Sequence, residues 1–259
     1  MRHYIQPAVA VLLLIASAAC SGEDDAAQQR TPPSGAKRVD VSKAGSLSGR
    51  VTIAGPVPHN QPINMSGDPA CQRANEGGAS FETIVSENGG LGNVFVYVKD
   101  GLGGYFFDTP SEPVILDQKG CRYTPHVFGV QVGQRVQFVN SDPLPHTVHA
   151  VPNANTEFNF SQPIQRQKDV RSFATPEVMV RFKCDLHNWM SAYAGVLEHP
   201  YFAVTRPGGE FELKNLPAGT YTIDAWHEKL GTQTQQVTLT ENDKKEVTFA
   251  FKSSAGTVP

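Results

Sequence analysis

From residue 47 onward, apolar and polar residues alternate in short runs, and no stretch repeats its apolar residues at helical spacing. The clearest strand-like runs are residues 49–53, 93–98, 135–139 and 220–226. Successive side chains of a strand point to opposite faces, so such runs can bury one face and expose the other. The 23 glycines and 19 prolines fit many tight turns between short strands. The pattern predicts an all-β protein, with residues 235–240 and 246–251 paired as a terminal hairpin.

Length and charge limit the partners of the chain. Its 259 residues are enough for one or two domains with a real core. Lysine and arginine number 22 against 25 aspartates and glutamates, which gives a formal net charge of -3. This balance provides no basic surface for phosphate groups, so nucleic acid is not expected as a partner.

The first 20 residues have the pattern of a secretory signal. Arg2 and His3 precede an apolar run over residues 8–16, and small residues lead from there to Cys20. The run is too short to cross a bilayer as a helix, which needs about 20 residues. The stretch ending at Cys20 resembles the lipobox of bacterial lipoproteins, although Ser17 stands where that family usually has leucine. An ordinary cleavage site beside a free Cys20 is the alternative.

Residues 21–45 contain mostly Glu, Asp, Gln, Pro, Ser and Lys, without apolar periodicity. Such a segment cannot bury enough surface to offset the entropy of ordering, so we expect a disordered tether. The resemblance to lipoproteins implies that acyl chains on Cys20 anchor the protein in the bacterial cell envelope, at the outer membrane or on the periplasmic face.

The C-terminal part carries a motif that is typical of one family of small β-sandwiches. Residues 209–213 read Gly-Glu-Phe-Glu-Leu, and residues 216–221 read Leu-Pro-Ala-Gly-Thr-Tyr. This pattern resembles the carboxypeptidase regulatory-like, transthyretin-like β-sandwich family. The strand that opens the sandwich in that family is matched here by residues 48–51, far upstream.

The separation of these two stretches predicts a divided domain. Residues 46–110 and 200–253 would form one split sandwich, and residues 111–199 would be inserted into it as a second domain. Two consecutive domains are the alternative, because insertion is the rarer topology.

A second motif has the residue types of a copper site. Cys184, His187 and Met190 follow one another at three-residue intervals, after a strand pattern over residues 178–184 that places Cys184 on the apolar face. Upstream, a proline-containing bend leads to His146 at the end of another strand pattern. A thiolate, two imidazoles and a weak thioether select copper, whereas zinc usually binds Cys and His without a thioether.

Residues 111–199 resemble the cupredoxins, the small blue copper proteins, and are most similar to the amicyanins. The resemblance rests on the Cys-x-x-His-x-x-Met loop and on an upstream Pro-His-x-Val-His stretch. It implies a Greek-key β-sandwich that holds one copper ion. His146, Cys184 and His187 would be equatorial ligands, and Met190 would be axial.

Two departures from the amicyanin pattern concern groups around the ligands. Leu186 and Asn188 replace prolines, so their N–H groups could donate toward the sulfur. Thr147 replaces an asparagine that ties the two ligand loops together in that family. Such groups tune the potential and the rigidity of a metal site, so the potential does not follow from the motif.

The remaining cysteines and histidines carry no metal motif. In an oxidising compartment Cys71 and Cys121 are expected to form a disulfide, and a second metal site of Cys121 with His126 is the alternative. His126 and His149 are interpreted as structural residues, and His227 as a residue at the surface or packed between the domains.

The expected function is one-electron transfer by a mononuclear type 1 copper protein, between redox partner proteins that the sequence does not identify. Four ligands leave no open position for substrate, so we expect no enzyme activity. In similar folds the loop histidine lies nearest the surface, which makes His187 the expected electron portal. The alternatives are a copper-dependent enzyme with an open site and a copper capture or delivery protein, the latter disfavoured by the presence of only four methionines.

Overall fold

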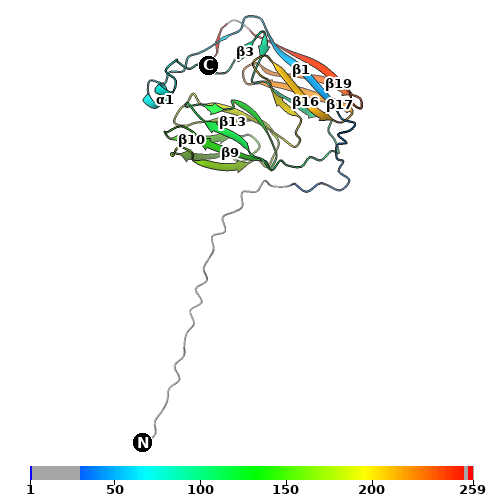
Figure 1. The fold of residues 1–259 in the computed structure, drawn as a ribbon, viewed down its shortest axis with the longest axis horizontal. Coiled ribbons are helices and arrows are strands. Elements are labelled where there is room, and N and C mark those ends of the chain that lie inside the picture. The colour runs from blue at the N-terminus through cyan, green and yellow to red at the C-terminus, as the bar shows by residue number, and fades with distance from the viewer. Residues whose placement is uncertain (2–29, 254–255, 259) are drawn as a thin grey trace.

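The computed structural model describes residues 30–253 and 256–258, together with Met1. Nearly all of their regular structure is β-strand, and the helix that they form is α1 (Pro69–Ala74) (Figure 1). The prediction of an all-β protein is confirmed. The predicted signal, Cys20 and the start of the predicted tether lie outside the described residues. No helix within the described ranges is long and apolar enough to cross a membrane.

One sandwich is built from the two ends of the described chain. In its first sheet, β1 lies between an antiparallel and a parallel partner, both from the C-terminal part. This sheet consists of β1 (Gly45–Ala54), β3 (Ser86–Glu87), β4 (Gly90–Leu91), β16 (Glu210–Leu216) and β19 (Lys244–Lys252). The facing sheet consists of β5 (Phe95–Asp100), β15 (Phe202–Val204), β17 (Gly219–His227) and β18 (Gly231–Leu239). Their inward residues form one core that includes Leu47, Val96, Tyr221 and Phe249.

The predicted terminal hairpin is wrong. β18 pairs with β17, whereas β19 crosses to the other sheet and pairs in parallel with β1 (Figure 1). Residues 240–243 carry the chain across. Because this crossing places Phe249 and Phe251 in the core between the two sheets, burial of their rings favours it over a simple hairpin.

The second sandwich is formed by the central part of the chain. One sheet has the order β11-β10-β13-β14-β8 and the other the order β12-β9-β6-β7. The strands are β6 (Val114–Gln118), β7 (Tyr123–Thr124), β8 (Val127–Gln131), β9 (Arg135–Asn140), β10 (His146–Val151), β11 (Phe158–Gln162), β12 (Lys168–Ser172), β13 (Glu177–Lys183) and β14 (Ser191–Leu197). Aromatic rings fill the centre, with Phe138 and Phe182 5.7 Å apart.

The two sandwiches contact each other at two paired glycines, where the strands of the second sandwich have no side chains. Gly129 of β8 and Gly195 of β14 are direct neighbours in the parallel register. Over them lie Phe95 and Phe202, whose rings stack at 5.6 Å. A Cβ atom on Gly129 would come within 2.2 Å of the Phe202 ring, so the close approach requires glycine.

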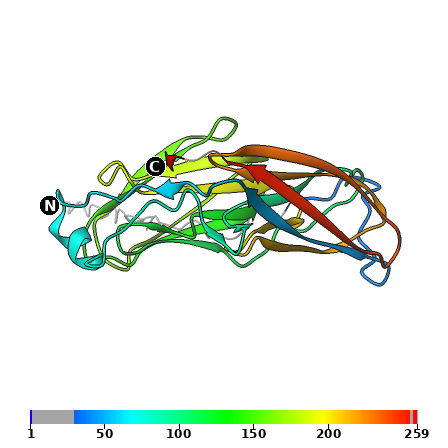
Figure 2. The same cartoon turned by 90° about the horizontal axis from the view of Figure 1, so that it is seen from above.

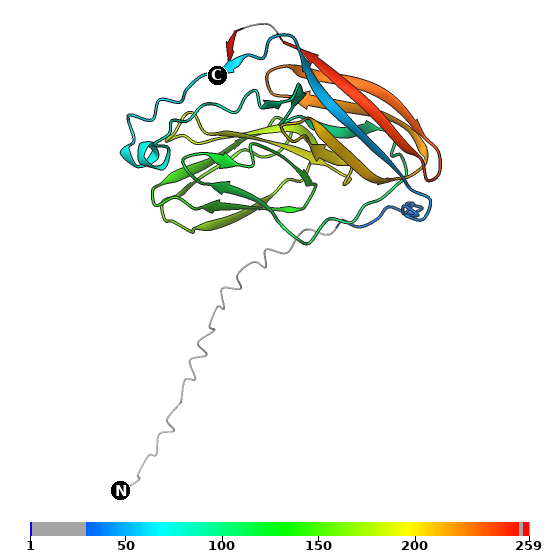
Figure 3. The same ribbon diagram turned by 45° about the horizontal axis from the view of Figure 1, so that its top comes forward.

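Residues 61–80, which we call the cover segment, leave the first sandwich and contact the second. Before this segment, β2 (His59–Asn60) pairs with β20 (Thr257–Val258). The segment carries α1 to the far end of the molecule (Figures 2 and 3). Met65 and Cys71 belong to the core of the second sandwich, although the sequence placed them in the first. The reason is the disulfide from Cys71 to Cys121 together with apolar contacts that no local pattern in the sequence reveals.

Residues 30–45 are not the disordered tether that their composition predicts. Lys37 exchanges backbone hydrogen bonds with Gly104 and Phe106, and Gly45 begins β1. Arg38 forms an ion pair with Asp108. Backbone hydrogen bonds and ionic contacts to the folded part therefore offset the entropic cost of ordering these residues. The composition of the segment alone does not predict these contacts.

Candidate metal centre

Four side chains proposed as ligands come from two neighbouring loops of the second sandwich. His146 is the first residue of β10, and Cys184 follows the last residue of β13. His187 and Met190 lie in the short loop that leads into β14. All four are buried, with exposed fractions of 0% for His146, 2% for Cys184, 5% for His187 and 1% for Met190.

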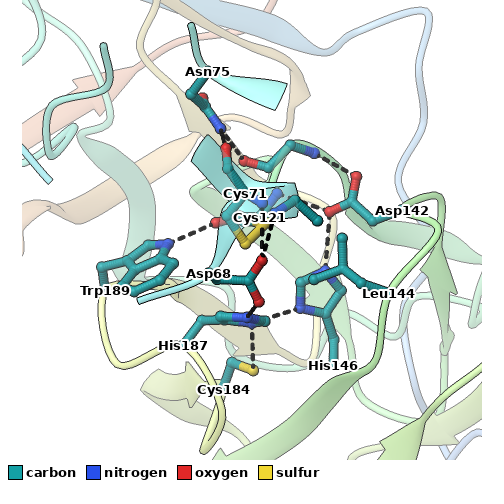
Figure 4. The surroundings of a disulfide bond; sticks show 12 residues. Asp68, Cys71, Asn75, Cys121, Asp142, Leu144, His146, Cys184, His187 and Trp189 are labelled. Atoms are coloured by element: carbon teal, nitrogen blue, oxygen red, sulfur yellow. Dashed lines mark hydrogen bonds and ion pairs between the residues drawn. A yellow bond between two sulfur atoms is a disulfide. The ribbon is translucent and has the colours of Figure 1, made fainter. Parts of the chain in front are cut away.

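The structure brings three of the predicted ligands together around one point (Figure 4). The Nδ1 atoms of His146 and His187 are 3.0 Å apart, and Cys184 Sγ is 3.8 Å from His187 Nδ1. One donor atom from each of these residues lies within 4.8 Å of the others. The two imidazole rings meet nearly edge to face at a centroid distance of 4.8 Å.

Met190 closes the ligand loop through its backbone. Its N–H donates to the carbonyl of His187 at 2.9 Å, and its own carbonyl accepts a hydrogen bond from Cys184 N at 3.4 Å. The thioether is buried in the same core cluster as Cys184.

A carboxylate holds the far nitrogen of each histidine. His146 Nε2 lies 2.9 Å from Asp142 Oδ2, and His187 Nε2 lies 3.1 Å from Asp68 Oδ2 (Figure 4). The pKa of Asp142 is lowered although burial opposes this, because His146 and the backbone N–H of Cys121 donate to its oxygens. The pKa of Asp68 is lowered mainly by the backbone N–H of Cys71 and also by His187. Ionised carboxylates only accept hydrogen bonds, so each Nε2 carries a proton.

This tautomer leaves two Nδ1 lone pairs facing each other. Two acceptors at 3.0 Å repel unless a proton or a metal ion lies between them. Burial acts to raise the pKa of Cys184, but its contacts with His146 and His187 and the hydrogen bonds that Thr147 donates outweigh it and lower the pKa to about 5. Cys184 is therefore a thiolate at neutral pH, and the donor set suits a soft cation.

Thr147 ties the two ligand loops together, although it stands where the amicyanins have asparagine. Its backbone N–H donates to Cys184 Sγ at 3.4 Å, and its hydroxyl lies 3.6 Å from the same sulfur. The hydroxyl oxygen also accepts a hydrogen bond from Asp185 N at 2.6 Å. Among the described residues, the backbone N–H that donates to the sulfur is thus that of Thr147, and not that of Leu186 or Asn188 as the sequence suggested.

Neither a protein-family model nor a curated protein sequence matches the chain. Solved structures match over part of it. A copper-containing nitrite reductase from Thermus scotoductus SA-01 is 20% identical over 36% of this chain, with a TM-score of 0.33, and this chain spans about a quarter of its length, 24%. A copper(I) form of an amicyanin variant is 22% identical over 32% of this chain and 81% of its own, with a TM-score of 0.29. At these scores the matches assign no family, and what the chain does has to follow from its own side chains.

The predicted disulfide is present. Cys71 of α1 is bonded to Cys121, and both residues are fully buried. The alternative of a metal site with Cys121 and His126 is wrong, because the sulfur is in the disulfide. The Nε2 atom of His126 instead contacts Glu228 at 2.5 Å.

The other two histidines also lie outside the ligand cluster. His149 contacts Asp185 and Glu157 near the surface. His227 is buried in the first sandwich, where its Nδ1 accepts hydrogen bonds from Lys229 N and Leu230 N.

His187 has the highest exposed fraction of the four proposed ligands, 5%, as expected, but its outer edge is covered, and its role as electron portal stays a prediction. Asp68 caps its outer nitrogen, and the ring of Trp189 lies 5.1 Å away, held by a hydrogen bond from Nε1 to the carbonyl of Cys121. Sequence reasoning missed Asp68 and Asp142. The only signal at Asp68 is an Asp-Pro helix start, which indicates an N-cap and not a contact with a residue more than a hundred positions away.

Proposed function

We propose that this chain binds one copper ion and carries single electrons. The ligands are His146 Nδ1, Cys184 Sγ and His187 Nδ1, with the thioether of Met190 as a weak axial ligand. The observation that carries the proposal is the convergence of the Nδ1 atoms of His146 and His187 and the sulfur of Cys184 on one buried point.

The donor set favours copper over zinc. Thiolate and imidazole bind both metals, but a thioether, here buried in the same core cluster as Cys184, suits copper in an electron-transfer geometry. Bound copper would supply reversible one-electron chemistry. The chain contributes a fixed ligand orientation, since Asp142, Asp68 and Thr147 each hold one ligand from behind.

Burial of the centre supports a carrier over an enzyme. All four proposed ligands are at most 5% exposed, so a substrate has little access to the ion. A copper enzyme with an open site is the second candidate, and strong binding of a small anion such as azide by the copper-loaded protein would favour it. Copper capture is the weakest candidate, because the chain has only four methionines.

We further propose that the protein works at the bacterial cell envelope, anchored through a lipid on Cys20, and exchanges electrons with redox proteins there. The export-signal pattern of residues 1–20 and the disulfide between Cys71 and Cys121 support an oxidising compartment. Metabolic labelling with a radioactive fatty acid tests the anchor, and Cys20→Ala should abolish the label.

The copper assignment is tested on protein that lacks residues 1–20. It should take up one equivalent of copper(II) and develop an intense thiolate-to-copper charge-transfer band. Cys184→Ser should abolish the band while circular dichroism still shows the β-fold. His59→Gln, which removes an exposed histidine outside the cluster, is the control and should keep it. A wild type that binds no copper under oxidising conditions, or a coloured Cys184→Ser protein, would falsify the assignment.

A further inference from the structure

The two carboxylate oxygens of Asp68 have different partners. Oδ1 caps α1, since it accepts hydrogen bonds from Ala70 N at 2.9 Å and Cys71 N at 3.0 Å. Oδ2 accepts a hydrogen bond from His187 Nε2 at 3.1 Å. One side chain therefore connects the start of the cover segment's helix to a proposed metal ligand (Figure 4).

The helix that presents Asp68 is fixed on the second sandwich. The disulfide joins Cys71 to Cys121, and Asn75 Nδ2 donates to the carbonyls of Cys71 and Gly120. Backbone N–H groups of Gly120 and Cys121 donate in turn to Asp142, both at 2.7 Å. Residues 120–121 thus support both carboxylates that contact the histidines. They donate hydrogen bonds to Asp142, and they hold the helix that presents Asp68 through the disulfide and the hydrogen bond from Asn75.

We propose that Asp68 is a positioning residue for His187 and that the cover segment closes this edge of the metal centre. The proposal deepens the proposed function and rests on it for its metal-binding part. An ionised carboxylate behind Nε2 keeps the proton on that nitrogen and aims the Nδ1 lone pair at the ion. Asp68 belongs to the cover segment, which lies outside the second sandwich. Without this segment, water would take the place of the carboxylate at His187 Nε2.

A purely structural role for Asp68 as an N-cap is separable by one substitution. In Asp68→Asn the amide oxygen can still accept from Ala70 and Cys71, because asparagine is as good an N-cap as aspartate. The amide NH₂ replaces Oδ2 and offers a donor to His187 Nε2. The matched control is Asp40→Asn, which alters a carboxylate that accepts from Ser42 N and Oγ in a turn of the first sandwich.

The first measurement uses metal-free protein and the ¹⁵N chemical shifts of its imidazoles. With the ring neutral, we expect the wild type and Asp40→Asn to carry the His187 proton on Nε2 and Asp68→Asn to carry it on Nδ1. The second measurement is competition for copper(II) with a chelator. Loss of a partner behind a ligating histidine costs about 10- to 100-fold in metal affinity, so Asp68→Asn should bind copper weaker by that factor and release it faster.

The two measurements fail in different ways. A wild type that binds no copper removes the proposed function, but the proton position of His187 still tests Asp68. A wild-type proton on Nδ1 of His187 overturns the positioning role, even if Asp68→Asn fails to fold. So does a folded Asp68→Asn protein with unchanged proton position and copper affinity.

Discussion

Single hydrogen bonds decide which nitrogen of His146 and of His187 faces the proposed metal centre. Asp142 and Asp68 hold the Nε2 atoms of the two histidines, so Nδ1 is the free nitrogen in both. Thr147 donates to Cys184 Sγ and accepts from the next residue, Asp185. A rigid ligand set of this kind needs little rearrangement when the charge of a bound ion changes.

Thr147→Val removes the hydroxyl and keeps the shape of the side chain. The N–H of Asp185 loses its acceptor, so the free energy of unfolding should fall by about 1 to 2 kcal/mol in urea titrations. The thiolate loses one donor, which favours the oxidised ion. The reduction potential of bound copper should therefore fall by up to about 40 mV in voltammetry. Thr52→Val, which removes a hydroxyl that bonds Phe249 O in the first sandwich, should leave the potential unchanged.

The elements around the proposed metal centre divide into a loop that holds three of the proposed ligands and a segment that covers them. The loop from Cys184 to Met190 is short and closed by its own backbone hydrogen bonds. The cover segment has one short helix and depends on the Cys71–Cys121 bond, which spans 50 positions of sequence. The stability of this end of the molecule should therefore depend strongly on the disulfide.

Cys71→Ala/Cys121→Ala should lower the free energy of unfolding of metal-free protein by about 4 kcal/mol, the chain-entropy value for a loop of this length. Urea titration of oxidised wild type and the double variant measures it. Hydrogen exchange should show faster exchange in residues 61–80, while β10 and β13 keep their protection. Equal exchange of this segment in both proteins would show that the disulfide does not hold it.

Periodicity and motif spacing were sufficient to predict the all-β class and the approach of His146, Cys184 and His187, whereas the role of Met190 stays a prediction. The disulfide partners followed from the expected oxidising compartment and from the two cysteines that carry no metal motif. Strand alternation is a local signal, and the Cys184–Met190 loop is short enough that its spacing reports geometry. The cover segment was not predictable, because its six-residue helix has no apolar periodicity and its contacts are distant in sequence. For the same reason the strand partner of β19 was wrongly predicted, and the contacts of residues 30–45 were not predicted at all, since each depends on a surface that only the folded molecule presents.

At the scale of the whole molecule, two sandwiches share one interface. Phe95 and Phe202 of the first lie on the paired glycines of the second. At the rim, His126 of the second sandwich contacts Glu228 of the first. Burial opposes it, but Glu228 raises the pKa of His126, so a charged pair links the two bodies below that pKa.

Gly129→Ala tests the interface. The new methyl group would overlap the ring of Phe202, and overpacking of this kind costs about 1 to 3 kcal/mol of unfolding free energy. Gly103→Ala adds a methyl group in open space and should change stability little. Thermal unfolding of both variants gives the comparison, and a second substitution, Phe202→Leu, should recover part of the loss in Gly129→Ala. Unchanged stability of Gly129→Ala would mean that the Phe202 ring moves aside without cost and that the contact does not require glycine.

Acid stability depends on a histidine buried far from the metal centre. Burial lowers the pKa of His227 to about 4, from 6.5 in an exposed histidine. A depressed pKa in the folded state means that the unfolded chain binds the proton first. The contribution of His227 to stability is therefore fully present above about pH 6.5 and is lost as the pH falls toward 4.

His227→Asn should flatten this part of the pH profile. The Asn oxygen can accept the hydrogen bonds from Lys229 N and Leu230 N that Nδ1 accepts now, but it does not titrate. A shift from 6.5 to about 4 corresponds to about 3 kcal/mol, so the wild type should lose about that much more unfolding free energy between these pH values than the variant. Urea titrations of metal-free protein across the range measure the difference. Because a lost ring also leaves a small cavity, the variant should be less stable at neutral pH, and only parallel profiles for the two proteins would contradict the role of His227.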